Sequence, residues 1–334
     1  MGPSSPTPMD LDSRLPRTPG HKPALAVFSA VAAGWVFVLV ALGAFTTTIG
    51  AGMAFPDWPL SNGSLNPTGW RSNISMFAEH SHRLSAMMMG LLTGILAVWI
   101  WATESRAWLR KLSYYAFGLV VAQGVVGGLR VLLNHVEVPS LETSLGELIA
   151  MLHACLAQAF ACVLIAIAVS CSRGWIAGPN HVGGRVERAG SLLCKALFLQ
   201  LAIAAVMRHS GAGLAIPSFP WSTPDGGLLP VIWNFRVGIQ FAHRVMALVI
   251  AVLIVVLAVA VWRDGASPAS MRAGAAALVG LVALQIFLGA AIIRTYRSPM
   301  VTTGHVLVGA VTLVTAAWLT WVAHRDAIED GVIL

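Results

Sequence analysis

The chain has 334 residues, of which 57% are hydrophobic and only 10% are charged. A soluble protein normally carries about 25% charged residues, so this composition excludes an ordinary soluble domain and indicates a protein surrounded mostly by lipid. The 21 Lys and Arg outnumber the 14 Asp and Glu, and in a membrane protein such an excess is typical of basic cytoplasmic loops rather than of nucleic-acid binding.

Residues 1–23 form a polar, proline-rich stretch that includes Asp10 and Asp12. The stretch lacks the short apolar core of a secretory signal peptide, and acidic residues are unusual in organelle transit peptides. We therefore expect a short, disordered cytoplasmic tail.

Eight apolar segments follow, each long enough to cross a bilayer as a helix, which takes about 20 residues. Only helices and closed barrels satisfy their backbone groups in lipid, and continuous runs of this length predict helices. The expected fold class is an all-α integral membrane protein. The predicted spans are 24–48, 76–101, 112–133, 145–170, 190–208, 238–262, 272–293 and 300–323.

The basic residues predict the orientation of these spans. Lys22, Lys111 and Lys195, which are all the lysines of the chain, fall on one side of the predicted membrane together with most of the arginines. The opposite side carries arginine alone. The side richer in positive charge faces the cytoplasm, so both termini are expected there.

A tandem repeat organises the chain. Several motifs recur about 161 residues later, and each copy holds four spans, so we expect two four-helix bundles of the same orientation, related by a pseudo-two-fold axis along the membrane normal. The residues that recur at this offset are 50–59 with 211–220, and His82 and Arg83 with His243 and Arg244; His153 in the fourth span corresponds to His305 in the eighth, 152 residues later. The predicted divisions are an N-terminal bundle at 24–175, a cytoplasmic linker at 176–189, a C-terminal bundle at 190–323 and a cytoplasmic tail at 324–334.

Four of the repeated residues are histidines inside spans: His82, His153, His243 and His305. Each lies within about two or three turns of the outer end of its helix. Two imidazoles that face each other inside a helix bundle can bind a haem iron from both sides. A histidine can also simply pack between helices, but ionisable groups in lipid are costly and usually functional. Zinc or copper is disfavoured because neither half offers a convincing third or fourth ligand.

Arginines near the outer ends of these helices suit the propionates of a haem, because a guanidinium binds carboxylates through two parallel hydrogen bonds. Arg83 and Arg244 directly follow two of the histidines and are the main candidates. The weaker candidates are Arg130, Arg208 and Arg294.

The two halves differ in charge around the first histidine of each pair. The offset of 161 sets Glu79 against Gln240; it also sets Asp57 against Ser218 and His80 against Phe241. Glu79 and His82 are three residues apart and share a helix face. A carboxylate there can take up protons or stabilise positive charge on a substrate carbon, which an amide cannot do. We hypothesise that the first half performs chemistry and the second holds a permanent redox cofactor; the alternative is that Glu79 only hydrogen-bonds a histidine nitrogen.

The motifs and their order over residues 24–323 resemble those of the haem A synthase family, whose members serve cytochrome oxidase assembly. The motifs are PDWPL at 56–60, EHSHR at 79–83, QGVVGG at 123–128, His153, FAHR at 241–244, and Gly304 with His305. The resemblance implies oxidation of a methyl group of haem O to a formyl group, which yields haem A. It implies haem O bound by His82 and His153 with Glu79 as the catalytic carboxylate, and a haem b cofactor bound by His243 and His305.

The resemblance also implies a bacterial cytoplasmic (inner) membrane as the location, with haem O synthase and cytochrome oxidase assembly factors as possible partners. Some family members carry two cysteines in the first outer loop, where this chain has Phe55 and Ser61. We therefore expect no thiol-based electron route and interpret the cysteines as packing residues. The outer loops either anchor the protein in the lipid headgroups or cover the haem sites.

Two other functions stay open at this point. A di-haem b cytochrome that only transfers electrons would use the same four histidines without needing Glu79. A haem transporter or chaperone would bind haem weakly in both halves and form no oxidised product. The oligomeric state is also open, a homo-oligomer included.

Overall fold

In the computed structural model, which describes residues 20–178 and 181–332, the chain forms eight long helices of 25 to 30 residues. All eight are apolar enough to cross a membrane, which confirms the predicted fold class. The helices are α1 (Pro23–Thr48), α2 (Ile74–Thr103), α3 (Ala107–Leu132), α4 (Leu145–Ser170), α6 (Gly184–His209), α7 (Phe235–Arg263), α8 (Ala269–Arg294) and α9 (Pro299–Ala323).

Six predicted spans agree with these helices to within about three residues at each end. The other two helices begin earlier, α3 at Ala107 rather than 112 and α6 at Gly184 rather than 190. Both early turns carry basic residues, which lower local hydropathy but do not end a helix. Most of the predicted tail (1–19) and part of the predicted linker (179–180) lie outside the described residues.

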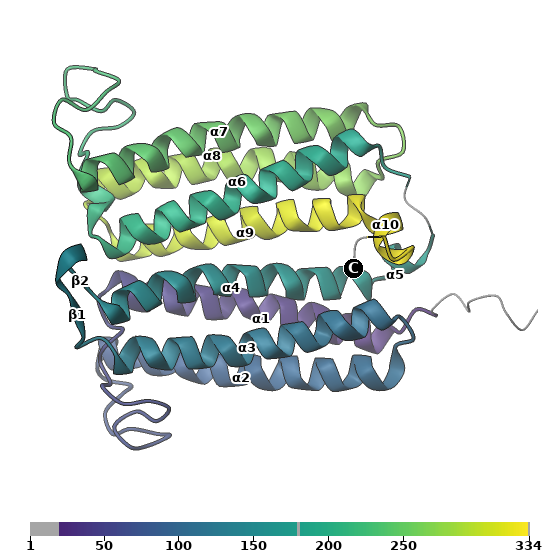
Figure 1. Ribbon diagram of the computed structural model, residues 1–334, viewed down its shortest axis with the longest axis horizontal. Helices are drawn as coiled ribbons and strands as arrows, with labels where there is room; N and C mark the ends of the chain where they lie inside the picture. The colour runs from purple at the N-terminus through teal and green to yellow at the C-terminus, as the bar shows by residue number, and fades with distance from the viewer. Residues whose placement is uncertain (1–19, 179–180, 333–334) are drawn as a thin grey trace, which may run out of the picture.

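The remaining elements are short. Two-residue strands β1 (Glu137–Val138) and β2 (Thr143–Ser144) pair antiparallel around the 3-10 turn η2 (Pro139–Leu141), and a second turn, η3 (Ala212–Leu214), follows α6. Two short helices, α5 (Arg173–Ile176) and α10 (Arg325–Glu329), lie near the other end of the molecule (Figure 1).

The helices run alongside one another in two groups of four, α1–α4 and α6–α9 (Figure 1). Within each group, consecutive helices pack against each other, and the groups meet where α1 and α4 contact α9 and where α4 contacts α6. The two longest loops, 49–73 and 210–234, project from the same end of the molecule. The packing agrees with two tandem bundles, whereas the pseudo-two-fold axis and the domain boundaries stay predictions.

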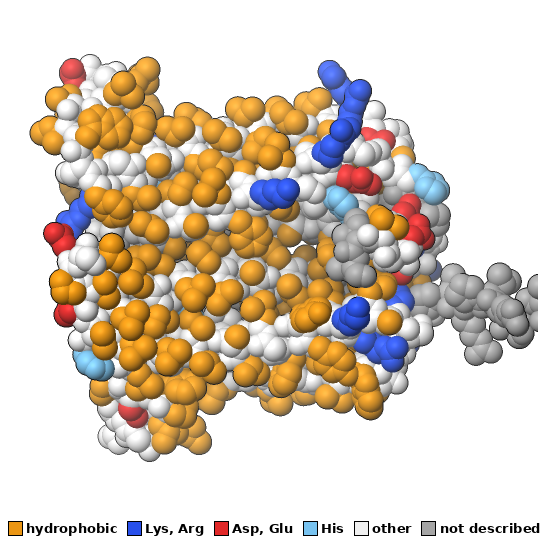
Figure 2. Space-filling view, in the orientation of Figure 1, with side chains coloured by type: hydrophobic (Ala, Val, Ile, Leu, Met, Phe, Trp, Pro, Cys, Tyr) orange, Lys and Arg blue, Asp and Glu red, His pale blue; other side chains and the backbone are white. Residues whose placement is uncertain are grey.

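Large apolar side chains cover the outside of the helices as well as the interior. Trp101 is 58% exposed and Phe287 is 65% exposed. In the space-filling view, hydrophobic side chains form a broad band, and charged side chains gather mainly toward the two ends (Figure 2). Such a surface is stable in lipid and not in water, so the protein is a multi-pass membrane protein.

The C-terminal segment is folded against the bundle rather than free. The Glu329 carboxylate of α10 accepts hydrogen bonds from Arg106 Nη1 at 3.2 Å, Trp108 Nε1 at 3.3 Å and Trp175 Nε1 at 2.5 Å. The rings of Trp108, Trp175 and Trp321 lie about 6 Å apart, at 6.1 to 6.3 Å between centroids. This cluster joins the start of α3 to the end of α9, and thus one half of the molecule to the other.

A buried ion pair supports the same cluster. Glu104, at the end of α2, accepts a hydrogen bond from Arg106 Nη2 at 3.0 Å, and both residues are less than 9% exposed. Burial by itself raises the pKa of the Glu104 carboxyl, but the hydrogen bonds and positive charge of Arg106 outweigh it, so this pKa lies below the ordinary value of 4.5. The ion pair therefore stabilises the fold at pH values above 4.5, and this stabilisation is lost as the pH falls through the lowered pKa of Glu104.

Replacing Glu104 by Gln removes the buried counter-ion of Arg106 and leaves it only the more exposed Glu329 carboxylate. We expect E104Q to lower the free energy of unfolding by about 3 kcal/mol at pH 7. In thermal melts of the detergent-solubilised protein, the difference from wild type should narrow below about pH 4.5. The exposed variant Glu137→Gln should melt like wild type, and a difference that grows in acid would contradict the assignment.

The predicted orientation has a direct test in two exposed positions at opposite ends. Thr68 lies in loop 49–73, and Ala266 lies between α7 and α8. In intact cells, we expect a membrane-impermeant maleimide to label Thr68→Cys and to label Ala266→Cys only after permeabilisation. The reverse pattern would place the termini outside.

Candidate functional site

The four predicted histidines lie at nearly one depth. His82, His153 and His243 each stand eight residues after the first residue of α2, α4 and α7, and His305 stands six after that of α9. At 1.5 Å per residue, the first three lie about 12 Å along their helices. All four helices start at the end that carries the long loops, so the imidazoles form one layer below those loops (Figure 1).

The histidines also come together in the predicted pairs. The ring centroids of His243 and His305 are 6.5 Å apart with the planes tilted by 53°. A metal ion bound at about 2 Å by one imidazole on either side would hold the two rings roughly 6 Å apart. In the first half, His82 and His153 are close enough to interact electrostatically.

The chemistry of this donor set fits a haem. Each pair supplies two imidazoles, and no group of three or more His, Cys, Asp or Glu side chains that could hold a metal ion occurs among the described residues. A bare zinc or copper ion needs more protein ligands, whereas a haem iron needs only axial ones. The Nδ1 atoms of all four imidazoles are buried and have no partner within hydrogen-bonding geometry.

Glu79 and Gln240 perform the same structural task in the two halves. Glu79 Oε2 accepts a hydrogen bond from the Phe55 N–H at 3.0 Å, and Gln240 Oε1 accepts one from the Ile216 N–H at 2.5 Å. Both side chains are only 4% exposed. Each therefore attaches an outer loop to the helix that carries a histidine, and the anchoring itself does not need a charge.

The charge of Glu79 is instead matched to Arg83. The two side chains form an ion pair, and Arg83 Nη1 also donates to the carbonyls of Asp57 at 2.8 Å and Leu60 at 2.5 Å. No histidine nitrogen accompanies Glu79 in these contacts. The hypothesis that Glu79 only hydrogen-bonds a histidine thus has no support in this geometry.

Arg244 repeats the loop contacts of Arg83 without an acid. Its Nη2 donates to the carbonyls of Ile216 at 3.0 Å and Ser218 at 2.7 Å. Both arginines thus hold backbone carbonyls of an outer loop. Their contact with haem propionates stays a prediction.

The three arginines that the sequence ranked as weaker candidates for binding propionates, Arg130, Arg208 and Arg294, lie in very different positions. Arg130 donates to the Gly52 carbonyl at 3.2 Å and interacts electrostatically with both His82 and His153. Arg294 is exposed. Arg130 is therefore better placed than its ranking from the sequence indicated, because only the packing of α3 brings it beside the histidine pair.

Arg208 joins the two halves rather than serving one of them. From α6 it donates to the Ala44 carbonyl at 2.7 Å and to Thr48 Oγ1 at 2.6 Å, both on α1.

Asp57 and His80 shape the first outer loop. The Asp57 carboxylate accepts hydrogen bonds from the N–H groups of Asn62 and Gly63, both at 2.7 Å. Slight burial raises the Asp57 pKa, but these bonds outweigh it and keep the pKa below its ordinary value. His80 Nδ1 lies 3.1 Å from Ser61 Oγ. Both groups are engaged within the loop structure, which the sequence comparison of the halves did not reveal.

Loop 49–73 packs onto the outer end of the first half. The Phe55 side chain is fully buried, and the Trp58 indole lies so close to α3 that a Cβ at Gly128 would stand 2.4 Å from it. The loop thus contacts α2 through Glu79 and α3 through Gly128 and covers the side of the bundle nearest the histidines.

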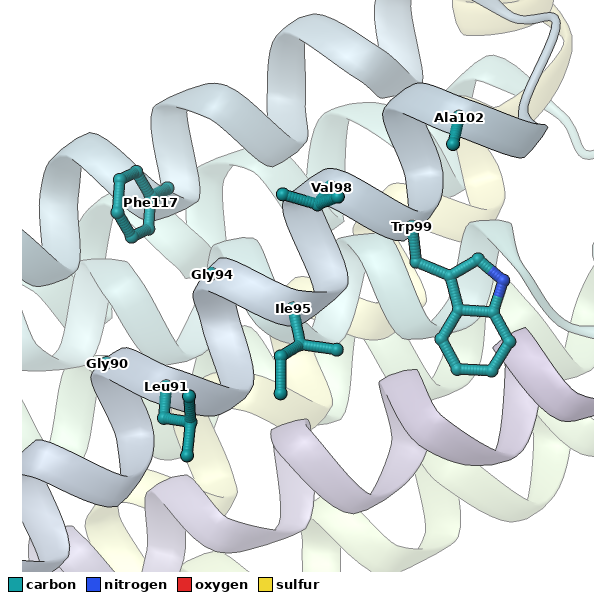
Figure 3. Close-up of a pocket in the computed structure, with 8 residues that line it drawn as sticks. All are labelled: Gly90, Leu91, Gly94, Ile95, Val98, Trp99, Ala102 and Phe117. Atoms are coloured by element: carbon teal, nitrogen blue, oxygen red, sulfur yellow. The ribbon is translucent and has the colours of Figure 1, made fainter.

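Two apolar hollows lie on the outer faces of α2 and α7, away from the histidines. The larger, of about 650 Å³, runs along α2 past Gly90, Gly94 and Val98 and is bordered by Phe117 (Figure 3). Leu91 in this groove is nine residues after His82, which places it about 180° around the helix. The hollow therefore faces lipid and does not continue the histidine site.

Comparison with known proteins agrees with this arrangement. The family model described as COX15-CtaA, cytochrome oxidase assembly protein, matches residues 26–318. The chain belongs to this family. The match spans all eight long helices, so both histidine pairs lie in the part of the chain that the COX15-CtaA model covers.

Several relatives are haem A synthases. The chain is 26% identical over 282 residues to that of Geobacillus kaustophilus, covering 83% of this chain and 84% of the relative. It is 28% identical over 283 residues to that of Symbiobacterium thermophilum, covering 80% and 85%. It is 26% identical over 342 residues to that of Caulobacter sp., covering 90% and 96%.

The shared anchoring role of Glu79 and Gln240 yields a matched pair of variants. E79Q keeps an acceptor for the Phe55 N–H but leaves the Arg83 charge without its counter-ion, so we expect it to lower the free energy of unfolding by about 3 kcal/mol. Glu79→Ala also removes that acceptor, so we expect a further loss of about 1 kcal/mol. Limited proteolysis of loop 49–73 in the purified protein should therefore be faster for E79A than for E79Q. Equal cleavage of the two variants would show that the charge, not the hydrogen bond, anchors the loop.

Proposed function

We propose that this protein is a haem A synthase, a membrane oxidoreductase that converts a methyl substituent of haem O to the formyl group of haem A for cytochrome oxidase. The observation that carries the proposal is the presence of two histidine pairs in a duplicated framework. Only the first pair has an ionisable side chain, Glu79, at the position that Gln240 occupies in the second half. Membership of the COX15-CtaA family and the haem A synthases among its relatives support it.

In this proposal the first bundle, 24–175, binds the substrate. His82 and His153 would hold the iron of haem O. Arg83 and Arg130 lie near that pair and would balance the charge of the haem propionates. Loop 49–73 excludes water from the outer side, since it packs against α2 and α3.

Glu79 is the proposed catalytic carboxylate. It lies one turn before His82 on α2. Conversion of a methyl group and water to a formyl group releases four electrons, which pass to an external electron acceptor, and four protons, which a base must accept. Its two oxygens each already accept one hydrogen bond, from Arg83 and from Phe55. An ionised carboxylate has about four acceptor sites, so Glu79 keeps capacity toward the substrate.

The second bundle, 190–323, holds the resident cofactor, haem b, through His243 and His305. A bound haem b supplies one-electron transfer. Gln240 in place of Glu79 attaches the loop without providing a base, and Arg244 holds the same loop carbonyls as Arg83 does in the first half. The second half therefore has the framework of the site but not its proton acceptor.

The proposal also includes a setting. The protein would reside in the bacterial cytoplasmic membrane with both termini inside, and would receive haem O from a haem O synthase and deliver haem A to assembly factors.

Expression in a host that makes haem O but lacks its own haem A synthase tests the function. We expect wild-type membranes to contain haem A, and the purified protein to contain haem b, identified by chromatography and mass. E79Q should retain haem b and form haem A about 100-fold more slowly, whereas the exposed loop variant Glu142→Gln should match wild type.

A second outcome would support the electron-transfer alternative. A protein with about two haem b per chain and no haem A in the membranes would be a di-haem cytochrome. Unimpaired haem A formation in E79Q would leave the enzyme assignment intact and remove Glu79 from the chemistry.

A further inference from the structure

Three of the four histidine rings lie against a glycine on a neighbouring helix. A Cβ built on Gly43 of α1 would stand 2.8 Å from His82 Cε1, and one on Gly127 of α3 would stand 3.0 Å from His153 Cε1. On α8, a Cβ at Gly289 would stand 3.5 Å from His305 Cε1. At the first distance a Cβ would force the ring to move, at the second the ring would have to give by a few tenths of an ångström, and the third is an ordinary van der Waals contact.

The rings have the same orientation at all three sites. The Cβ at Gly43 would be 3.2 Å from His82 Nδ1 and 3.4 Å from Nε2, and the Cβ at Gly127 would be 3.5 and 3.8 Å from the same atoms of His153. At Gly289, Nδ1 of His305 is at 3.9 Å. The Cε1 edge of the ring thus faces the glycine helix in each case, with Nδ1 nearer to it than Nε2.

Each of these imidazoles also lies near the main chain four residues before the glycine. The neighbouring backbone group is that of Leu39 for His82, Gln123 for His153 and Gln285 for His305, and in each case the buried Nδ1 stops short of hydrogen-bonding geometry. A helical N–H is already donated to the preceding turn, so the group that faces the imidazole is the carbonyl. Because the glycine one turn later has no Cβ, an imidazole can approach this carbonyl from the side.

His243 is the exception. The offset that relates the halves places Ala204 where Gly43 stands and Gln200 where Leu39 stands. The Gln200 side chain donates through Nε2 to the His243 carbonyl at 3.1 Å, as Gln123 does to that of His153, and it also lies 3.4 Å from His243 Nε2. His243 Nδ1, like that of the other three histidines, is buried without a partner.

We propose that Gly43, Gly127 and Gly289 are positioning residues, which open a helix carbonyl to accept the Nδ1–H of a ligand histidine, and that Ala204 withholds such an acceptor from His243. The inference rests on the proposed role of these histidines as iron ligands. A hydrogen bond from a ligating imidazole to an acceptor fixes the ring and makes it a stronger electron donor to the metal. The second-half haem then has one such ligand, His305, and one weaker donor, His243.

Two substitutions in the second half are expected to change the access of a histidine to its carbonyl acceptor in opposite directions. Ala204→Gly opens the Gln200 carbonyl to His243, and we expect the midpoint potential of the bound haem b to fall because the ferric state gains donation. Gly289→Ala places a methyl group against the His305 ring beside the Gln285 carbonyl, which restricts the approach of the ring to that carbonyl. We expect the potential to rise, with weaker haem retention during purification.

The measurement is a redox titration of the Soret and α bands of the purified holoprotein, together with its haem content. Gly280→Ala is the matched control, because Gly280 is on the same helix nine residues from Gly289, has open space around it and is exposed. Its potential should equal that of wild type. A204G only removes a methyl group, so it keeps the test decisive should G289A fail to accumulate.

Shifts of opposite sign in A204G and G289A, or a fall in A204G alone when G289A cannot be purified, support the inference. An unchanged potential in A204G, or shifts of the same sign, would overturn it while leaving the haem-binding function intact. Purified wild-type protein without any haem would instead overturn the proposed function itself.

Discussion

A lipid bilayer offers no water to hydrogen-bond a buried polar group, and the arrangement of this molecule depends on that constraint. Each imidazole inside the helix bundles needs either a metal or a protein acceptor, and the helix carbonyls that could serve are normally shielded by side chains. Glycine at positions such as Gly127 removes that shield. Close packing of α3 on α4 and of α8 on α9 therefore follows from the same residues that orient His153 and His305.

The same constraint bears on the two halves. Both attach an outer loop through a buried side chain on the histidine helix, Glu79 in one and Gln240 in the other. The amide satisfies the loop without a charge, which is the less costly solution in a low-dielectric setting. The carboxylate is paired with Arg83, and the proposed role as a proton acceptor would account for its presence in the first half. The two halves thus share the loop attachment and differ in its charge.

Much of the site could be predicted because its signals are local or periodic. Apolar length revealed the spans, and the tandem repeat of four spans singled out the four histidines from the others in the chain. The roles of Asp57 and His80 could not be predicted. The comparison of the two halves marks them only as ionisable groups near the site. In the structure they contact the Asn62 N–H and Ser61 Oγ of the loop, and no helical spacing relates these groups to them. The Glu329 cluster was missed for a similar reason, because its partners lie more than 150 residues away along the chain.

By itself, the sequence determined that this protein spans a membrane with eight helices, that it is built from a repeat, and that four histidines recur within it, because hydropathy and periodicity are properties of neighbouring residues. The tertiary structure decided which groups meet: the pairing of Glu79 with Arg83, the approach of Arg130 to the first histidine pair, and the contact of three imidazoles with glycine helices. Those outcomes depend on how helices from distant parts of the chain rotate and pack, and packing in lipid is set by surfaces that form only when the helices associate.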